Sequence, residues 1–121
     1  MTQDEFEKVV EEALSEIPEE FLEKIENIDI LVEEAPTPEM ARSMKVTQNG
    51  LLGLYSGIPH NKRSPFFYGN VLPDRIYIFK KNLESCCRNR EELKEQIQRT
   101  VLHELGHYFG ISDKRLRELG F

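Results

Sequence analysis

The sequence predicts a single domain in which α-helices pack against a small β-sheet, and three observations support this prediction. Its 121 residues are close to the commonest size of one domain. Apolar residues recur at helical spacing near both ends of the chain. Between them lie three short runs predicted to be strands, a β-branched run at 28–33, a run after an Asn-Gly turn at 51–55 and an alternating aromatic run at 75–79. We therefore expect one unit, residues 1–121, without repeats.

Composition and charge exclude several classes of protein. With 39% hydrophobic and 31% charged residues, the chain has the composition of an ordinary globular protein. A formal net charge of -6 argues against sequence-independent binding to nucleic acids or anionic membranes. The first residues are acidic and amphipathic, unlike a signal peptide or a membrane span. We expect a cytoplasmic monomer without nucleic-acid or membrane partners.

The leading segment is predicted to be a helix that a proline interrupts. Thr2 and Glu5 have the spacing of a capping box. The apolar residues that follow have helical spacing, at Phe6, Val9, Val10, Ala13, Leu14 and Ile17. Pro18 breaks or restarts the helix, and a second apolar face continues to about Asn27.

The middle of the chain begins with a strand, because residues 28–33 form a β-branched run. A loop follows, in which Thr37 and Pro38 are placed to cap and open a short helical turn through Met44. This turn separates the first predicted strand from the second.

Two further strands are predicted on either side of a long loop. Asn49 and Gly50 mark a turn before a strand at 51–55. Residues 56–74 are rich in Gly, Pro, Asn and Ser, which is typical of a surface loop. The alternating aromatic and β-branched run at 75–79 predicts the third strand.

The two cysteines, Cys86 and Cys87, are adjacent in the sequence. Neighbouring cysteines rarely bridge each other, and two are too few for a disulfide framework. We expect both thiols to be reduced and partly buried in a helical turn.

The last long helix is marked by its own signals. Asn89 with Glu92 predicts its start. One apolar stripe runs along it, formed by Leu93, Ile97, Val101, Leu105 and Tyr108. His103 and His107 lie beside this stripe, so the helix can pack on a sheet while both imidazoles face a cleft. A short closing helix is expected at 114–119.

The segment HELGHYFGISD within this region has the pattern of a metal site. His103 and His107 are four residues apart, so on a helix they lie about 40° apart and about 6 Å along the axis. Both imidazoles can then reach one metal ion at about 2.1 Å.

Three further residues of the segment complete the predicted site. Glu104 can reach a water molecule on the metal more easily than the metal itself. Gly110 can turn the chain out of the helix, so that Asp113 returns as a third ligand. Three protein ligands and one open position are typical of a catalytic site.

Two alternative interpretations stay open. The helix could be a surface helix with two solvated histidines. Asp113, beside Ser112 at a helix start, could be only a cap or a partner of the helix dipole.

The same segment resembles the H-E-x-x-H-x-x-G-x-x-H/D signature of zincin metallopeptidases. The acidic leading helix and the segments GLYSGIP, LPDRIYIF and RTVLHELGHYFGISDKRLRELG also resemble small bacterial zincin-like proteins, the minimal zincins. This resemblance implies an α+β fold, in which a small twisted mixed sheet packs against the motif helix and an N-terminal helix. It also implies a Zn2+ cofactor at His103, His107 and Asp113, Glu104 as catalytic acid and base, and a peptide or protein substrate.

The sequence departs from larger zincins in two ways. Asp113 stands where they usually have His, and a carboxylate ligand makes the metal a weaker Lewis acid. No methionine follows the motif, so we expect no Met-turn and a shallow, open cleft.

Three functional classes follow from these residues. A zinc metallopeptidase is the first, and a non-catalytic zinc-binding or partner-recognition module is the second. A zinc nuclease is the third, although Glu104 and the acidic balance count against it.

A peptide substrate would lie antiparallel to an exposed sheet edge. The donor to the developing oxyanion is open among Tyr55, His60, Arg63, Tyr68 and Tyr77.

Overall fold

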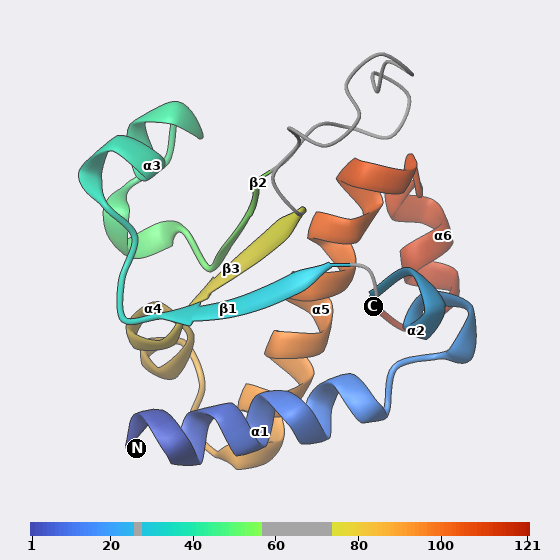
Figure 1. The fold of residues 1–121 in the computed structure, drawn as a ribbon, viewed down its shortest axis with the longest axis horizontal. Coiled ribbons are helices and arrows are strands. Elements are labelled where there is room, and N and C mark those ends of the chain that lie inside the picture. The colour runs from blue at the N-terminus through green and yellow to red at the C-terminus, as the bar shows by residue number, and fades with distance from the viewer. Residues whose placement is uncertain (26–27, 57–73) are drawn as a thin grey trace.

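The computed structural model describes residues 1–25, 28–56 and 74–121, without the side chains of His107 and Tyr108. These parts form an α+β structure of helices around a three-stranded sheet (Figure 1). In chain order the elements are α1 (Gln3–Ser15), α2 (Glu19–Ile25), β1 (Asp29–Glu33), α3 (Pro38–Ser43), the 3-10 turn η1 (Gln48–Gly50), β2 (Gly53–Ser56), β3 (Arg75–Phe79), α4 (Lys80–Ser85), α5 (Arg90–Phe109) and α6 (Asp113–Glu118).

The sheet is mixed, and its strand order is β1-β3-β2. Strand β1 runs parallel to the central strand β3, with Ile30 opposite Ile76. Strand β2 runs antiparallel to β3, with Leu54 opposite Tyr77. The outer strands β1 and β2 therefore form the two edges of the sheet.

Helices α1 and α5 share one hydrophobic core with the sheet. Helix α5 contacts β2 and β3, and α1 packs on α5. The predicted apolar faces are the buried ones, formed by Phe6, Val9 and Ala13 of α1 and by Leu93, Ile97, Val101 and Leu105 of α5. Because burial of each Phe, Val, Leu or Ile side chain in these faces contributes roughly 1.5–3 kcal/mol, the two faces hold α1 and α5 in the shared core.

The ends of the two long helices are formed by the residues that the sequence indicates. The Thr2 hydroxyl accepts the Glu5 N–H over 3.1 Å, and the Glu5 carboxylate accepts the Thr2 N–H over 3.4 Å. The Asn89 side chain accepts the Glu92 N–H over 2.9 Å. Gly110 ends α5 in the left-handed conformation, with φ of 69°.

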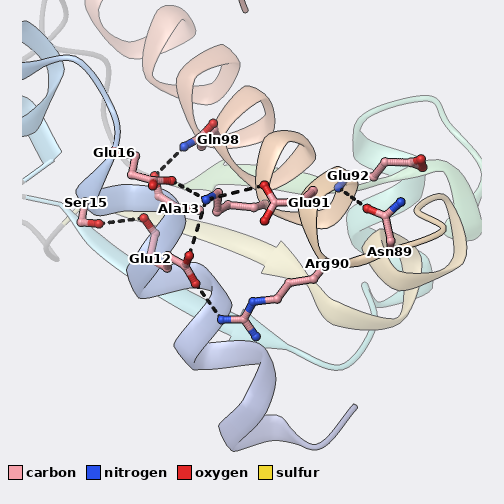
Figure 2. Close-up of polar contacts among 10 residues, drawn as sticks. Glu12, Ala13, Ser15, Glu16, Asn89, Arg90, Glu91, Glu92 and Gln98 are labelled. Carbon is pink, nitrogen blue, oxygen red and sulfur yellow. Dashed lines mark hydrogen bonds and ion pairs between the residues drawn. The ribbon is translucent and has the colours of Figure 1, made fainter.

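Ion pairs also join α1 to α5 (Figure 2). The Nζ atom of Lys94 lies 2.7 Å from the Glu16 carboxylate and 3.5 Å from that of Glu12. The Arg90 guanidinium donates to Glu12 over 2.6 Å, and Gln98 donates to a main-chain carbonyl of α1. The hydrogen bond from Arg90 lowers the pKa of Glu12, and the one to Glu16 raises the pKa of Lys94.

The structure differs from the sequence prediction at three places. Helix α4 was not predicted, because its sequence KKNLES contains one apolar residue, Leu83, and no side chain caps it. The second strand begins at Gly53 rather than at residue 51, because the Asn82 side chain donates to the Leu51 carbonyl over 2.7 Å. Cys87 is half-buried as expected, but Cys86 is exposed; neither is in a disulfide.

The remaining predicted elements lie close to the observed ones. The closing helix begins at Asp113, one residue earlier than expected. Most of the predicted loop, residues 57–73, lies outside the described residues. No helix in the described ranges is both long and apolar enough to cross a membrane.

Candidate metal centre

Three of the four predicted site residues lie on α5. This helix is unbroken from Arg90 to Phe109, so the backbones of His103 and His107 are one turn apart on the same side. The His103 side chain is 38% exposed, at the border between core and solvent. The imidazole of His107 lies outside the part of the structure that is described.

The turn after α5 carries the chain back toward His103. Gly110 adopts a positive φ that is costly for residues with a Cβ, and its N–H donates to the Gly106 carbonyl. The Ile111 N–H donates to the same carbonyl over 3.0 Å. These bonds reverse the chain within a few residues and start α6 beside the last turns of α5.

This reversal brings Asp113 close to His103. The Asp113 Oδ1 atom lies 3.7 Å from His103 Nδ1, and the Asp113 side chain is 76% exposed. The hydroxyl of Ser112 accepts the Arg115 N–H over 3.1 Å, so Ser112, and not Asp113, is the residue that caps α6. Because the Asp113 carboxylate does not cap the helix, it can interact with the dipole of α6 and with His103.

The donor set of this pair suits zinc. A separation of 3.7 Å is too long for a hydrogen bond. Two ligands of one tetrahedral zinc ion lie about 3.4 Å apart, given metal–ligand distances near 2.1 Å. Among the described side chains no group of three or more His, Cys, Asp or Glu is placed to hold a metal ion. His107, whose side chain lies outside the described part, is the predicted ligand that would complete the set with His103 and Asp113.

Glu104 is held by the edge of the sheet. Its Oε2 atom accepts the main-chain N–H of Tyr55 over 2.9 Å. The Leu52 carbonyl accepts the Phe79 N–H, so in this antiparallel pair alternate residues from Leu52 onward bond to β3. Tyr55 therefore directs its N–H away from β3, and the Glu104 carboxylate lies at the outer edge of β2.

A glycine allows this close approach of β2 to α5. A Cβ atom at Gly53 would lie 2.6 Å from Cγ2 of Thr100 and 3.8 Å from Cγ of Glu104. Thr100 is buried and precedes Glu104 by one helical turn, so both side chains face β2. Gly53 was not among the predicted site residues, although a glycine within a strand often marks a close backbone contact.

The candidate oxyanion donors are divided between two parts of the chain. Tyr55 and Tyr77 are half-buried in the sheet. His60, Arg63 and Tyr68 lie outside the described residues. The group of Tyr55 that reaches the site is its main-chain amide, which no argument from side-chain type predicts.

Comparison with known proteins identifies the family. No individual curated protein matches the chain. Residues 25–121 match the family of zincin-like metallopeptidases. The matched region contains the whole sheet, α5 and α6, and thus every element that positions the candidate site. The chain belongs to the zincin-like metallopeptidase family, as its resemblance to minimal zincins implied.

Proposed function

We propose that the chain is a zinc-dependent peptidase, folded as one domain over residues 1–121, whose metal ligands are His103, His107 and Asp113. The family match supports the metallopeptidase class. The observation that carries the proposal is the 3.7 Å approach of His103 Nδ1 to Asp113 Oδ1. These residues come from different helices, and an imidazole and a carboxylate at this separation are the pair of donors that zinc accepts.

Glu104 is the proposed general base and acid. When bound, zinc lowers the pKa of a water molecule and polarises the scissile carbonyl. The Glu104 carboxylate takes a proton from the attacking water and delivers it to the leaving amine nitrogen as the C–N bond breaks. The N–H of Tyr55 orients this carboxylate, which is already at the sheet edge before substrate arrives.

The outer edge of β2 is the proposed place for the substrate. Gly53 and Tyr55 direct main-chain groups toward this edge, next to Glu104. An extended peptide pairing there would place its carbonyl groups near the carboxylate. A protein or peptide substrate in extended conformation fits this arrangement.

The exposure of the site favours a second candidate function. The Asp113 side chain is 76% exposed and that of His103 is 38% exposed, so this part of the site is shallow. A shallow zinc site also suits a non-catalytic module that recognises a partner protein.

A cleavage assay with removable metal distinguishes these functions. Protein freed of metal with a chelator, and the same protein reloaded with zinc, would be incubated with a peptide library and the products identified by mass spectrometry. We expect cleavage by the reloaded sample alone, and none by a His103→Ala/His107→Ala double variant. Equal cleavage with and without zinc would contradict the metallopeptidase proposal. Zinc binding without any cleavage would favour the recognition module.

A further inference from the structure

A groove of about 380 Å³ runs between α1 and the edge strand β1. Both elements contribute apolar side chains to it, namely Val10, Leu14, Ile30 and Val32. Val10 is buried and the other three are half-buried. Because β3 separates β1 from β2, the groove lies at the opposite edge of the sheet from the Tyr55–Glu104 contact.

Strand β1 directs main-chain hydrogen-bonding groups outward along this groove. The Asp29 N–H donates to the Asp74 carbonyl, so Asp29 and alternate residues after it bond toward β3. Ile30 and Val32 point their main-chain groups the other way, and the Val32 carbonyl accepts a 3.5 Å bond from Gln3 Nε2. Within residues 1–25, 28–56 and 74–121, the N–H and C=O of Ile30 have no hydrogen-bond partner.

The rim of the groove is acidic. Glu7 and Glu11 project from adjacent turns of α1, and Glu33 ends β1; all three are exposed. Within the described residues, none of these three carboxylates lies within ion-pair distance of a lysine or arginine. In contrast, Glu12 of the same helix and Glu16 at its C-terminal end are paired with cations of α5. Glu7 and Glu11 therefore place uncompensated negative charge on the groove side of α1.

We propose that this groove binds an extended peptide segment of a partner protein in which basic and apolar residues alternate. The peptide backbone would add to the sheet at Ile30, as in strand addition between an edge strand and a helix. Apolar side chains would cover Val10 and Leu14, and basic side chains would meet Glu7 and Glu11. This site is separate from the proposed metal centre and does not depend on catalysis.

Charge disfavours a second copy of the chain as the occupant of the groove. Pairing of two β1 edges would bring together the acidic ends of both strands, Asp29 and Glu33, and the acidic rims beside them. Like charges placed opposite each other destabilise strand pairs, and each chain carries a net charge of -6. A basic partner removes this repulsion.

Fluorescence anisotropy with a labelled synthetic peptide, in which lysine alternates with valine, tests the proposal on the full chain. We expect saturable binding that weakens by about tenfold in a Glu7→Gln/Glu11→Gln variant, because two exposed charge pairs are lost. A Glu19→Gln/Glu23→Gln variant is the matched control, since it removes the same charge at the same spacing from α2. Its affinity should equal that of wild type.

The position of the peptide is checked by amide hydrogen exchange measured by NMR. The Ile30 amide should become protected when the peptide is added, and a peptide with proline in place of valine should bind far less well. Equal weakening by the α1 and α2 variants would overturn the proposal, because it would indicate nonspecific charge attraction. Failure of Ile30 to gain protection, or no binding at low salt, would also overturn it.

Discussion

The main-chain N–H of Tyr55 donates a 2.9 Å hydrogen bond to Oε2 of Glu104, although the two residues are 49 positions apart in the sequence. This bond ties the edge of β2 to the helix that carries the histidines. It gives the proposed general base a defined direction, and it depends on the close contact of β2 with α5 at Gly53.

A Gly53→Ala variant tests this contact. Its Cβ would lie 2.6 Å from Thr100 Cγ2, so we expect a loss of about 1–3 kcal/mol in the free energy of unfolding and faster exchange of the Tyr55 amide. Thr100→Ser removes the clashing methyl group and keeps the hydroxyl, so the double variant should recover part of the lost stability and of the lost protection of the Tyr55 amide. The 3.2 Å approach of the Cβ to the main-chain oxygen of Tyr77 stays in place. Urea denaturation measures the stability, and NMR-detected exchange measures the protection.

The rescue is the decisive part of this experiment. If Thr100→Ser does not improve Gly53→Ala, the clash with Thr100 is not what makes glycine necessary at this position. If Gly53→Ala leaves the Tyr55 amide as protected as in wild type, Gly53 does not control the approach of β2 to Glu104.

Paired variants separate the two roles considered for Asp113. Asp113→Ala should weaken zinc binding tenfold or more while the fold is kept, and Asp113→His should largely restore binding. Ser112→Ala removes the cap of α6, so it should cost about 1 kcal/mol of stability and leave zinc affinity unchanged. Competition with a chromophoric chelator measures affinity. If Asp113→Ala binds zinc as tightly as wild type, Asp113 is not a ligand and acts only on the dipole at the start of α6. Glu118 would then be the next candidate ligand to test.

The pairs between α1 and α5 predict a stability that falls in acid. The hydrogen bond from Arg90 holds the pKa of Glu12 below its usual value of 4.5. Ionised Glu12 therefore adds to the free energy of unfolding above pH 4.5, and this stabilisation is lost as the pH falls through the lower pKa that Glu12 has in the folded state. The pKa of Lys94 is raised above 10.5, chiefly by its hydrogen bond to Glu16. The stabilisation by charged Lys94 is therefore present below pH 10.5 and is lost as the pH rises through the higher pKa of the folded state.

A Glu12→Gln variant checks the sign of this effect. Denaturation series between about pH 6 and about pH 3 should show wild type losing its advantage over the variant as the pH falls. A constant difference between the two proteins across this range would show that Glu12 contributes no pH-dependent stability.

The cysteines should differ in reactivity. Burial, and after it the hydrogen bond with Cys86, raises the pKa of the Cys87 thiol to about 12, whereas Cys86 is exposed. Brief treatment with iodoacetamide near pH ~8 should therefore modify Cys86 first, because the thiolate is the reactive form. Peptide mapping would show this, and preferential labelling of Cys87 would contradict it.

Local signals in the sequence predict much of the fold. The capping residues Thr2 and Asn89, and the terminating Gly110, act within a few residues of themselves, so their effect is visible without tertiary structure. Helix α4 was not predicted because Leu83 is its one apolar residue, and a single apolar residue has no periodicity.

The site is predictable to the extent that it is local. His107 is four residues after His103 and three after Glu104, so on any continuous helix its position is next to both, and spacing alone groups the three residues. The contacts of Glu104 with Tyr55 and of His103 with Asp113 depend on how β2 and α6 pack beside α5. Such contacts arise from tertiary packing, which spacing within one element does not specify.

The most direct measurement of the central claim compares zinc-loaded wild type with Glu104→Gln. Glutamine has nearly the same volume and its carbonyl can still accept the Tyr55 N–H, but it is not basic enough to take a proton. We expect equal zinc content per chain and cleavage slower by about 10²–10⁴-fold in the variant. Equal cleavage by both proteins would contradict the role of Glu104 and assign the activity to another source.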